Sequence, residues 1–195
     1  HLEGLERQAE LFRRGELWSP LEKNLRLQQS ARTDLGQLVA LHRELAQLYD
    51  ARLDFPARAI DSWQDLLVIE PHDVEAQHAL DRLLTDAKRF PELLDHLSYM
   101  LTHGAAGERP GLLHLRRAQI LRDELDESSR ARPDWESLLE LEPENIEALE
   151  SLADSVLGFN EYQAWTDLTL RRLVLPDDNF CRRKLELIKV LGGKL

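Results

Sequence analysis

The side chains best able to do chemistry in this sequence are ten carboxylates that lie close together in its last third. Between Pro133 and Leu170 the chain holds no Lys or Arg. The ten acids are Asp134, Glu136, Glu140, Glu142, Glu144, Glu147, Glu150, Asp154, Glu161 and Asp167. Because like charges at this density repel one another, a basic ligand would be steered toward the run and would relieve the repulsion. The alternative interpretation is a solvated face that binds nothing.

His72, Glu75 and His78 raise the question of a metal site. Metal-binding histidines on one helix usually lie four residues apart on a single face, as in H-E-x-x-H, and these do not. The equivalent residues of a later repeat are all glutamates: Glu144, Glu147 and Glu150. We therefore predict no metal site and no cofactor.

Signatures of known enzymes are missing from the sequence. It has no Gly-rich phosphate loop, no G-x-S-x-G element and no Cys/His pair with a supporting motif. Cys181 lies beside basic residues that favour a thiolate, yet a single thiol without a general base is usually inert. His42 and His114 recur at the same place in a repeat, which favours a structural or surface role over catalysis. We predict that the chain is not an enzyme.

These residues belong to a chain that repeats itself after 72 positions without a gap. Residues 41–84 return as residues 113–156. The identical pairs are Leu41/Leu113, His42/His114, Ala46/Ala118, Gln47/Gln119, Leu53/Leu125, Asp54/Asp126, Arg58/Arg130, Ala59/Ala131, Trp63/Trp135, Leu66/Leu138, Leu67/Leu139, Glu70/Glu142, Pro71/Pro143, Glu75/Glu147, Ala76/Ala148 and Leu80/Leu152. The match indicates duplication, and it predicts a repeat array in which each unit touches its neighbours.

Apolar residues at helical spacing lie between the prolines and predict helices. We place all eight prolines at the edges of segments, where proline opens or ends a helix. The predicted helices are 5–14, 19–30, 38–52, 56–69, 74–87, 91–102, 111–125, 129–141, 146–157, 161–174 and 179–191. Trp63 and Trp135 follow the apolar stripe and are expected in the core. Trp18 and Trp165 are expected to pack as well, with exposure of Trp165 as an alternative.

The chain resembles the tetratricopeptide-repeat family, whose unit is a helix-turn-helix pair of about 34 residues. The matching residues are Leu45, Ala46, Tyr49, Ala59, Trp63, Leu66 and Pro71, then Ala118, Leu121, Trp135, Leu138 and Pro143, with a weaker copy at Leu152, Ala153, Val156, Ala164, Leu168 and Pro176. The resemblance implies an all-α fold, a right-handed α-solenoid forming one repeat domain over residues 1–195. Its pairs would cover about 1–34, 35–71, 72–109, 110–143 and 144–176, followed by a C-terminal helix at 177–193.

The resemblance also implies a concave groove lined by the first helix of each pair. In the family's register the groove residues that we expect to contact a partner are Arg43, Gln47, Asp50, Glu75, His78, Arg82, Leu112, Leu115, Gln119, Arg122, Glu147, Glu150 and Asp154. A register error of one residue would move some of them to the core or the outer face. Leu112 and Leu115 would add an apolar anchor beside the acids.

Composition limits the partners. A net charge of −11 disfavours nucleic acid, which needs a basic face, and favours basic partners. No run of 18 apolar residues exists, so we expect no membrane insertion. The single Cys181 and the absence of a signal-peptide pattern predict a reducing, cytoplasmic location. The chain begins with His1 and its basic residues are mostly Arg, so we interpret it as a piece of a longer bacterial protein.

Together these features predict a non-catalytic scaffold that binds a peptide segment or a partner domain, with basic residues, in the groove. Two alternatives stay open. The chain could be a structural module that assembles with further copies of itself, so homo-oligomerisation is one expectation. It could also be the regulatory domain of an enzyme.

Overall fold

A computed structural model of the chain describes residues 2–104, 109–158 and 161–175, and every regular element in these ranges is helical. The expectation of an all-α fold is therefore confirmed. The elements are α1 (Leu2–Arg14), α2 (Trp18–Ser30), α3 (Leu35–Leu48), the π-helical η1 (Tyr49–Leu53), α4 (Pro56–Ile69), α5 (Val74–Asp86), α6 (Phe90–His103), α7 (Pro110–Gln119), the π-helical η2 (Ile120–Glu124), α8 (Ser128–Leu141), α9 (Ile146–Gly158) and α10 (Tyr162–Val174). The helix predicted at 179–191 lies outside the described residues.

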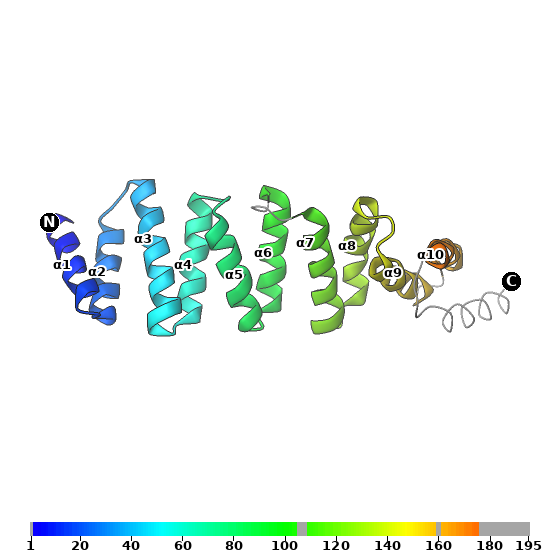
Figure 1. Cartoon of the computed structure of the whole chain (residues 1–195), viewed down its shortest axis with the longest axis horizontal. Helices are drawn as coiled ribbons and strands as arrows, with labels where there is room; N and C mark the ends of the chain where they lie inside the picture. The colour runs from blue at the N-terminus through cyan, green and yellow to red at the C-terminus, as the bar shows by residue number, and fades with distance from the viewer. Residues whose placement is uncertain (1, 105–108, 159–160, 176–195) are drawn as a thin grey trace. The chain divides into compact units, whose positions relative to one another are not determined.

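The helices form hairpins that are grouped in two compact units. The first unit, His1–Gly107, holds α1 to α6, and the second unit, Glu108–Leu195, holds α7 to α10. Within each unit every helix packs against the helices that precede and follow it in sequence (Figure 1). Each unit is therefore a stack of helix-turn-helix pairs. None of the described helices has the length and apolarity that a bilayer span requires.

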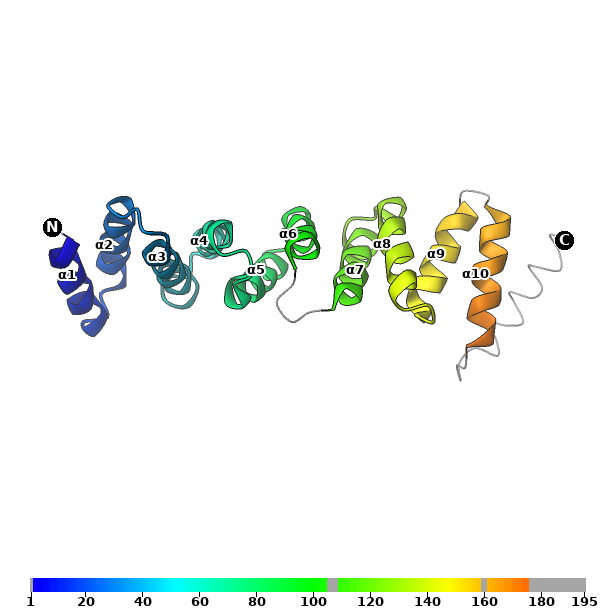
Figure 2. The ribbon, with the colours of Figure 1, turned by 90° about the horizontal axis from the view of Figure 1, so that it is seen from above.

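The first unit has two layers of helices. Figure 2 shows α3 and α5 on one side of this unit and α4 and α6 on the other. We call these the first-helix side and the second-helix side. The arrangement follows from pairing, because the first and second helices of successive hairpins alternate along the chain.

Most of the duplicated apolar residues are buried in both units, as the apolar spacing predicts. Ala46 and Ala118 are fully buried, as are Leu66 and Leu138, and Trp63 and Trp135 are each 2% exposed. Trp165 is buried too, which confirms packing for this residue rather than exposure. Complete burial of a large apolar side chain contributes about 1.5–3 kcal/mol, so these positions account for much of the stability of each unit.

The duplication extends to the backbone of the turns. Among the residues that the structure describes, four other than glycine have positive φ, and they form two pairs at the 72-residue offset: Glu16 (52°) with Lys88 (53°), and Asp54 (53°) with Asp126 (54°). Matching hydrogen bonds close the turns, since Leu17 N donates to Phe12 O and Arg89 N donates to Leu84 O, both at 2.9 Å. A left-handed residue just beyond a helix end turns the chain so that the following backbone N–H groups satisfy the last carbonyls of the helix.

Helix starts also correspond between the two units. Asp73 caps α5 by accepting a hydrogen bond from Ala76 N at 2.8 Å, and Asn145 accepts from Ala148 N at 3.1 Å before α9. Asp and Asn are among the preferred caps because their short side chains reach these unpaired backbone donors.

Two details differ from the sequence prediction. Pro133 lies inside α8 rather than at a segment edge, so the prediction for this proline was wrong. Its ring is exposed, and it lacks the N–H that would donate to Ser129, so α8 loses one hydrogen bond and is not ended. The predicted helices 38–52 and 111–125 each finish in a π-helical turn, η1 and η2.

Candidate functional site

The structure places all thirteen predicted groove residues on the first helix of a pair. In the first unit they lie on α3, η1 and α5, and in the second unit on α7, η2 and α9. Many of them contact one another within a unit, although they are about 30 positions apart in sequence.

In the first unit the predicted residues form a polar ladder between α3 and α5. Gln47 Nε2 donates to Glu75 Oε1 at 2.6 Å, and Arg43 Nε lies 3.1 Å from Glu75 Oε2. Arg43 also forms an ion pair with Asp73, the cap of α5, and Arg82 of α5 reaches back to Asp50 in η1. The cationic side chains of this ladder are therefore neutralised by acids of the same unit.

In the second unit the equivalent residues form a similar polar ladder, but a pocket lies beside it. Gln119 Nε2 donates to both carboxylate oxygens of Glu147 at 3.0 Å, which repeats the contact between Gln47 and Glu75. Arg122 Nη2 donates to Glu147 Oε1 at 2.9 Å and Arg122 Nη1 donates to Ser151 Oγ at 2.8 Å. Next to these contacts the surface is hollowed.

A pocket of about 470 Å³ opens between η2, α8 and α9. We call it the Ser155 pocket; its lining residues are Arg122, Ser128, Trp135, Glu147, Glu150, Ser151, Asp154 and Ser155. Four of them, Arg122, Glu147, Glu150 and Asp154, were predicted as groove residues. The second unit thus gathers a basic group, three carboxylates and three hydroxyls around one cavity.

The size of one side chain explains why the second unit is hollow here. Ser155 stands where the first unit has Leu83, which is buried. Replacing a leucine by a serine removes volume, and a packed interior fills such a gap only in part. The Ser155 hydroxyl is itself buried and has no hydrogen-bond partner among the described residues. A buried hydroxyl with no partner favours a ligand or water that supplies one.

A second difference between the two units reverses a pair of charges beside the Ser155 pocket. Asp50 and Arg82 pair in the first unit, and the equivalent residues of the second unit are Arg122 and Asp154, with the charges reversed. The Arg122 guanidinium donates to Asp123 at 2.6 Å and lies 5.3 Å from the centroid of the Trp135 ring. The hydrogen bond from Arg122 lowers the pKa of Asp123, and the same bond raises the pKa of Arg122. Arg122 therefore remains charged and is held in one position.

Arginines from outside the acidic run neutralise half of its carboxylates. Arg172, 4% exposed on its side chain, donates to Glu150 at 2.8 Å, and Arg132 donates to both Glu136 and Glu161 at 2.8 Å. Arg122 pairs with Glu147, and Arg117 Nη1 lies 3.6 Å from the buried Asp134, which also meets His114 Nδ1 at 2.8 Å. The self-repulsion expected from the sequence is therefore smaller than a count of charges within the run suggests. Asp154 and Asp167 stay exposed.

Some predicted residues are not brought to the pocket. Leu112 is 44% exposed and Leu115 is half-buried on α7, and neither lines the Ser155 pocket. His78 is exposed on α5 in the other unit. The predicted groove residues did not include Ser128, Ser151 and Ser155, because these serines carry no motif. Comparison of the two copies offered one signal, since Ser155 replaces the apolar Leu83.

In the ranges 2–104, 109–158 and 161–175, no group of three or more His, Cys, Asp and Glu side chains is arranged to hold a metal ion. The Ser155 pocket offers hydrogen-bond donors and acceptors together with carboxylates, which suits recognition of a polar or basic side chain.

By its fold the chain is a helical-repeat protein of the tetratricopeptide-like kind. No family model matches its sequence, and no curated protein matches it. It is similar to a crystal structure of MamA, with a TM-score of 0.46 and 15% identity over 85% of this chain and 92% of that one. It is also similar to a putative kinesin light chain of Podospora anserina with nearly identical TPR-like repeats, with a TM-score of 0.44 and 17% identity over 89% of this chain and 95% of that one.

A third similar structure is MamA of Desulfovibrio magneticus RS-1 from residue 41 to its end. The TM-score is 0.42 and the identity 15%, over 89% of this chain and 94% of that one. Similarities of this size concern the arrangement of helices and say nothing about what this chain binds.

Proposed function

We propose that the chain is a non-catalytic scaffold that binds a polypeptide segment at the first helices of its second unit. A Lys or Arg side chain of that segment enters the Ser155 pocket. The observation that carries the proposal is the cavity itself, formed where Ser155 replaces the larger Leu83. A polar pocket between helices suits one side chain of a partner. The neighbouring polar ladder would contact the rest of the segment.

The charges around the pocket favour a basic side chain. Glu147 and Glu150 are each paired with an arginine, and the exposed Asp154 is a third carboxylate that lines the pocket. The Ser155 hydroxyl supplies an acceptor inside. An incoming ammonium or guanidinium group would donate to the Ser155 hydroxyl and lie near the Asp154 carboxylate. Such complementary charges increase the rate of association.

The test uses peptides selected from a random library against the whole protein, with affinities measured by titration calorimetry. The Ser155→Leu variant fills the pocket with the residue that the first unit carries at this place, so it is expected to fold. It should weaken binding about tenfold or more. Asp154→Lys should weaken binding by a similar factor, and wild-type affinity should fall as ionic strength rises.

The matched control is Glu140→Lys, which makes the same change in charge on the exposed face of α8 away from the pocket. It should leave affinity unchanged. The variant Glu150→Lys is less suitable, since it would leave the buried Arg172 without its carboxylate. Selected peptides without a preference for Lys or Arg, or full affinity in Ser155→Leu, would refute the proposal.

A further inference from the structure

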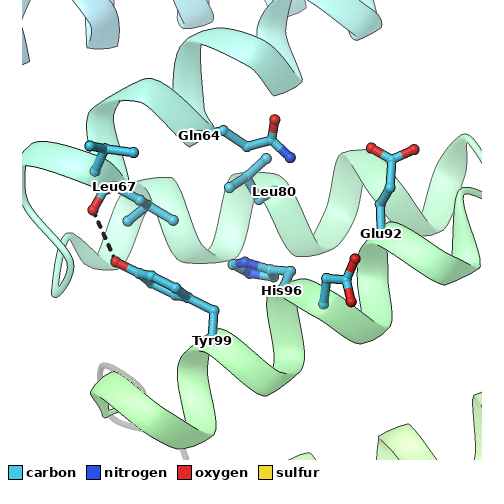
Figure 3. Close-up of a pocket in the computed structure, with 8 residues that line it drawn as sticks. Gln64, Leu67, Leu80, Glu92, His96 and Tyr99 are labelled. Carbon is cyan, nitrogen blue, oxygen red and sulfur yellow. Dashed lines mark hydrogen bonds between the residues drawn. The ribbon is translucent and has the colours of Figure 1, made fainter.

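A second hollow lies on the second-helix side of the first unit, in a place that the sequence did not single out. It has a volume of about 250 Å³ and is lined by Gln64, Leu67 and Val68 of α4, Leu80 of α5, and Glu92, Asp95, His96 and Tyr99 of α6. We call it the Val68 hollow. Figure 3 shows Tyr99 and His96 projecting from α6 toward Leu67 and Leu80.

Apolar side chains make the floor and one wall of this hollow. Leu80 and Leu67 are buried beneath it, while Val68 is 82% exposed at its edge. Exposure of this extent for an aliphatic side chain is costly in water when it adjoins other apolar surface. The hollow therefore offers apolar area that a partner could cover.

The aromatic side chains of α6 that line the hollow are already held in position by hydrogen bonds. The Tyr99 hydroxyl donates to Leu67 O at 2.9 Å, as the dashed line in Figure 3 shows. The Tyr99 ring also stacks on His103, with centroids 4.2 Å apart. His96 Nε2 lies 3.1 Å from Gln77 O. A cavity whose walls are already ordered costs little conformational entropy to fill.

The rim of the hollow is acidic. Asp95 is exposed and has no ion-pair partner among the residues that the structure describes. Glu92 is bound by Arg89, whose Nε donates to it at 2.6 Å. One uncompensated carboxylate thus stands beside the apolar floor, and the partner that complements it carries a positive charge next to an apolar side chain.

The second copy of the repeat provides an internal comparison. At the 72-residue offset, Val68 is replaced by Glu140 and Tyr99 by Arg171, whose Nη2 donates to Pro143 O at 2.9 Å. The apolar edge and the aromatic wall of the first unit are therefore both charged in the second. The duplication shows that this helix-turn-helix framework folds with either set of residues.

We infer that the Val68 hollow is a docking site for a polypeptide segment of another protein that places one aliphatic or aromatic side chain in the hollow and a Lys or Arg against Asp95. The volume suits a single side chain, because cavities that bind small molecules are usually larger, roughly 300–1,000 Å³. The site is distinct from the Ser155 pocket, which lies in the other unit. The first unit would add its own contact to the same scaffold.

The experiment measures binding of labelled 15-residue peptides by fluorescence anisotropy to the whole protein. Each peptide has a central Leu or Phe, and the flanking positions carry either Lys or Glu. Peptides flanked by Lys should bind more tightly than peptides flanked by Glu. Val68→Glu, which introduces the residue found in the second unit, should weaken the Lys-flanked peptides about tenfold or more, because it buries a carboxylate against an apolar side chain.

Two matched controls separate the hollow from the general negative charge of the protein. Val174→Glu makes the same substitution at a valine that is 83% exposed near a helix end in the second unit, and it should have no effect. Asp95→Lys should weaken the Lys-flanked peptides and strengthen the Glu-flanked ones. Asp167→Lys, at the position equivalent to Asp95, should do neither.

Each other outcome overturns the inference. Binding that survives Val68→Glu, or equal binding of both peptide sets, removes the hollow as the site. Failure of every peptide to bind does the same. Binding lost in Ser155→Leu but retained in Val68→Glu assigns the peptides to the Ser155 pocket. If sedimentation shows self-association that Val68→Glu abolishes, the occupant is a second copy of the chain and not another protein.

Discussion

At the scale of single residues, the environment of His42 has a consequence for stability. His42 is buried between hairpins, where its ring nitrogens lie 3.0 and 3.3 Å from the Gln29 amide and Nδ1 lies 3.7 Å from Asp65. Burial lowers the pKa of His42 below its usual 6.5, and the nearby Asp65 opposes this shift with a smaller effect. The folded chain therefore keeps His42 neutral where an unfolded chain would bind a proton.

The prediction is that stability falls with acid partly through this residue. Above pH of about 6.5 the contribution is fully present, and it is lost as the pH falls toward the lowered pKa, because the unfolded state then binds more protons. Urea unfolding at about pH 7.5 and about pH 5.5 should show a smaller loss of unfolding free energy for His42→Gln than for wild type. Equal losses in the two proteins would contradict this account, since all other titrating groups are shared.

At the scale of helices and turns, residues other than glycine occupy left-handed positions after several of the described helices. Lys88 follows α5 with φ of 53°, a conformation in which a side chain costs about 1–2 kcal/mol. Glycine adopts this conformation without that cost but loses more entropy on folding. The difference between these two effects determines the sign of a substitution.

Lys88→Gly should raise the free energy of unfolding by roughly 0.5–1 kcal/mol, measured by urea denaturation followed by circular dichroism. The neighbouring Ala87 has φ of −78° and caps α5 in a right-handed conformation. Ala87→Gly should therefore destabilise by roughly 0.5–1 kcal/mol, for the entropic reason alone. Destabilisation by both variants would mean that the Lys88 side chain contributes more than its backbone strain costs.

At the scale of the molecule, each of the two compact units contains one copy of the buried tryptophan. Trp63 belongs to the first unit and Trp135 to the second, and both are buried to the same extent. In repeat proteins the stability of a unit depends on its own packing and on its immediate neighbours. Matched substitutions can therefore show how far the effect of a cavity spreads.

Trp63→Ala and Trp135→Ala should each cost about 3–5 kcal/mol, because they leave a large cavity. Hydrogen exchange read by mass spectrometry should show loss of protection mainly in residues 1–107 for the first variant and mainly in residues 109–175 for the second. The two variants serve as controls for each other. A uniform loss of protection over the chain in either variant would show that the units unfold as one.

The sequence by itself determined which segments are helices, the 72-residue duplication and the buried core. The helical spacing of apolar residues and the residues that favour turns are both local signals. They predicted the limits of α4 to the residue, and they correctly placed Trp63 and Trp135 in the core. The prediction that Arg43, Gln47 and the other groove residues lie on first helices came instead from the resemblance to the tetratricopeptide-repeat family and its register. Pro133 was misplaced because an exposed helix position tolerates the loss of one hydrogen bond.

Only the tertiary structure decided which of these residues are available to a partner. Gln47 and Glu75 lie 28 positions apart and meet only because α3 and α5 lie on the same side of the first unit, and Arg172 likewise reaches Glu150 of the acidic run from the next helix. The two hollows depend on differences in side-chain size and burial between the copies, at Ser155 and at Val68. Distances across packed helices determine pairing and free volume, and no local pattern in the chain encodes those distances.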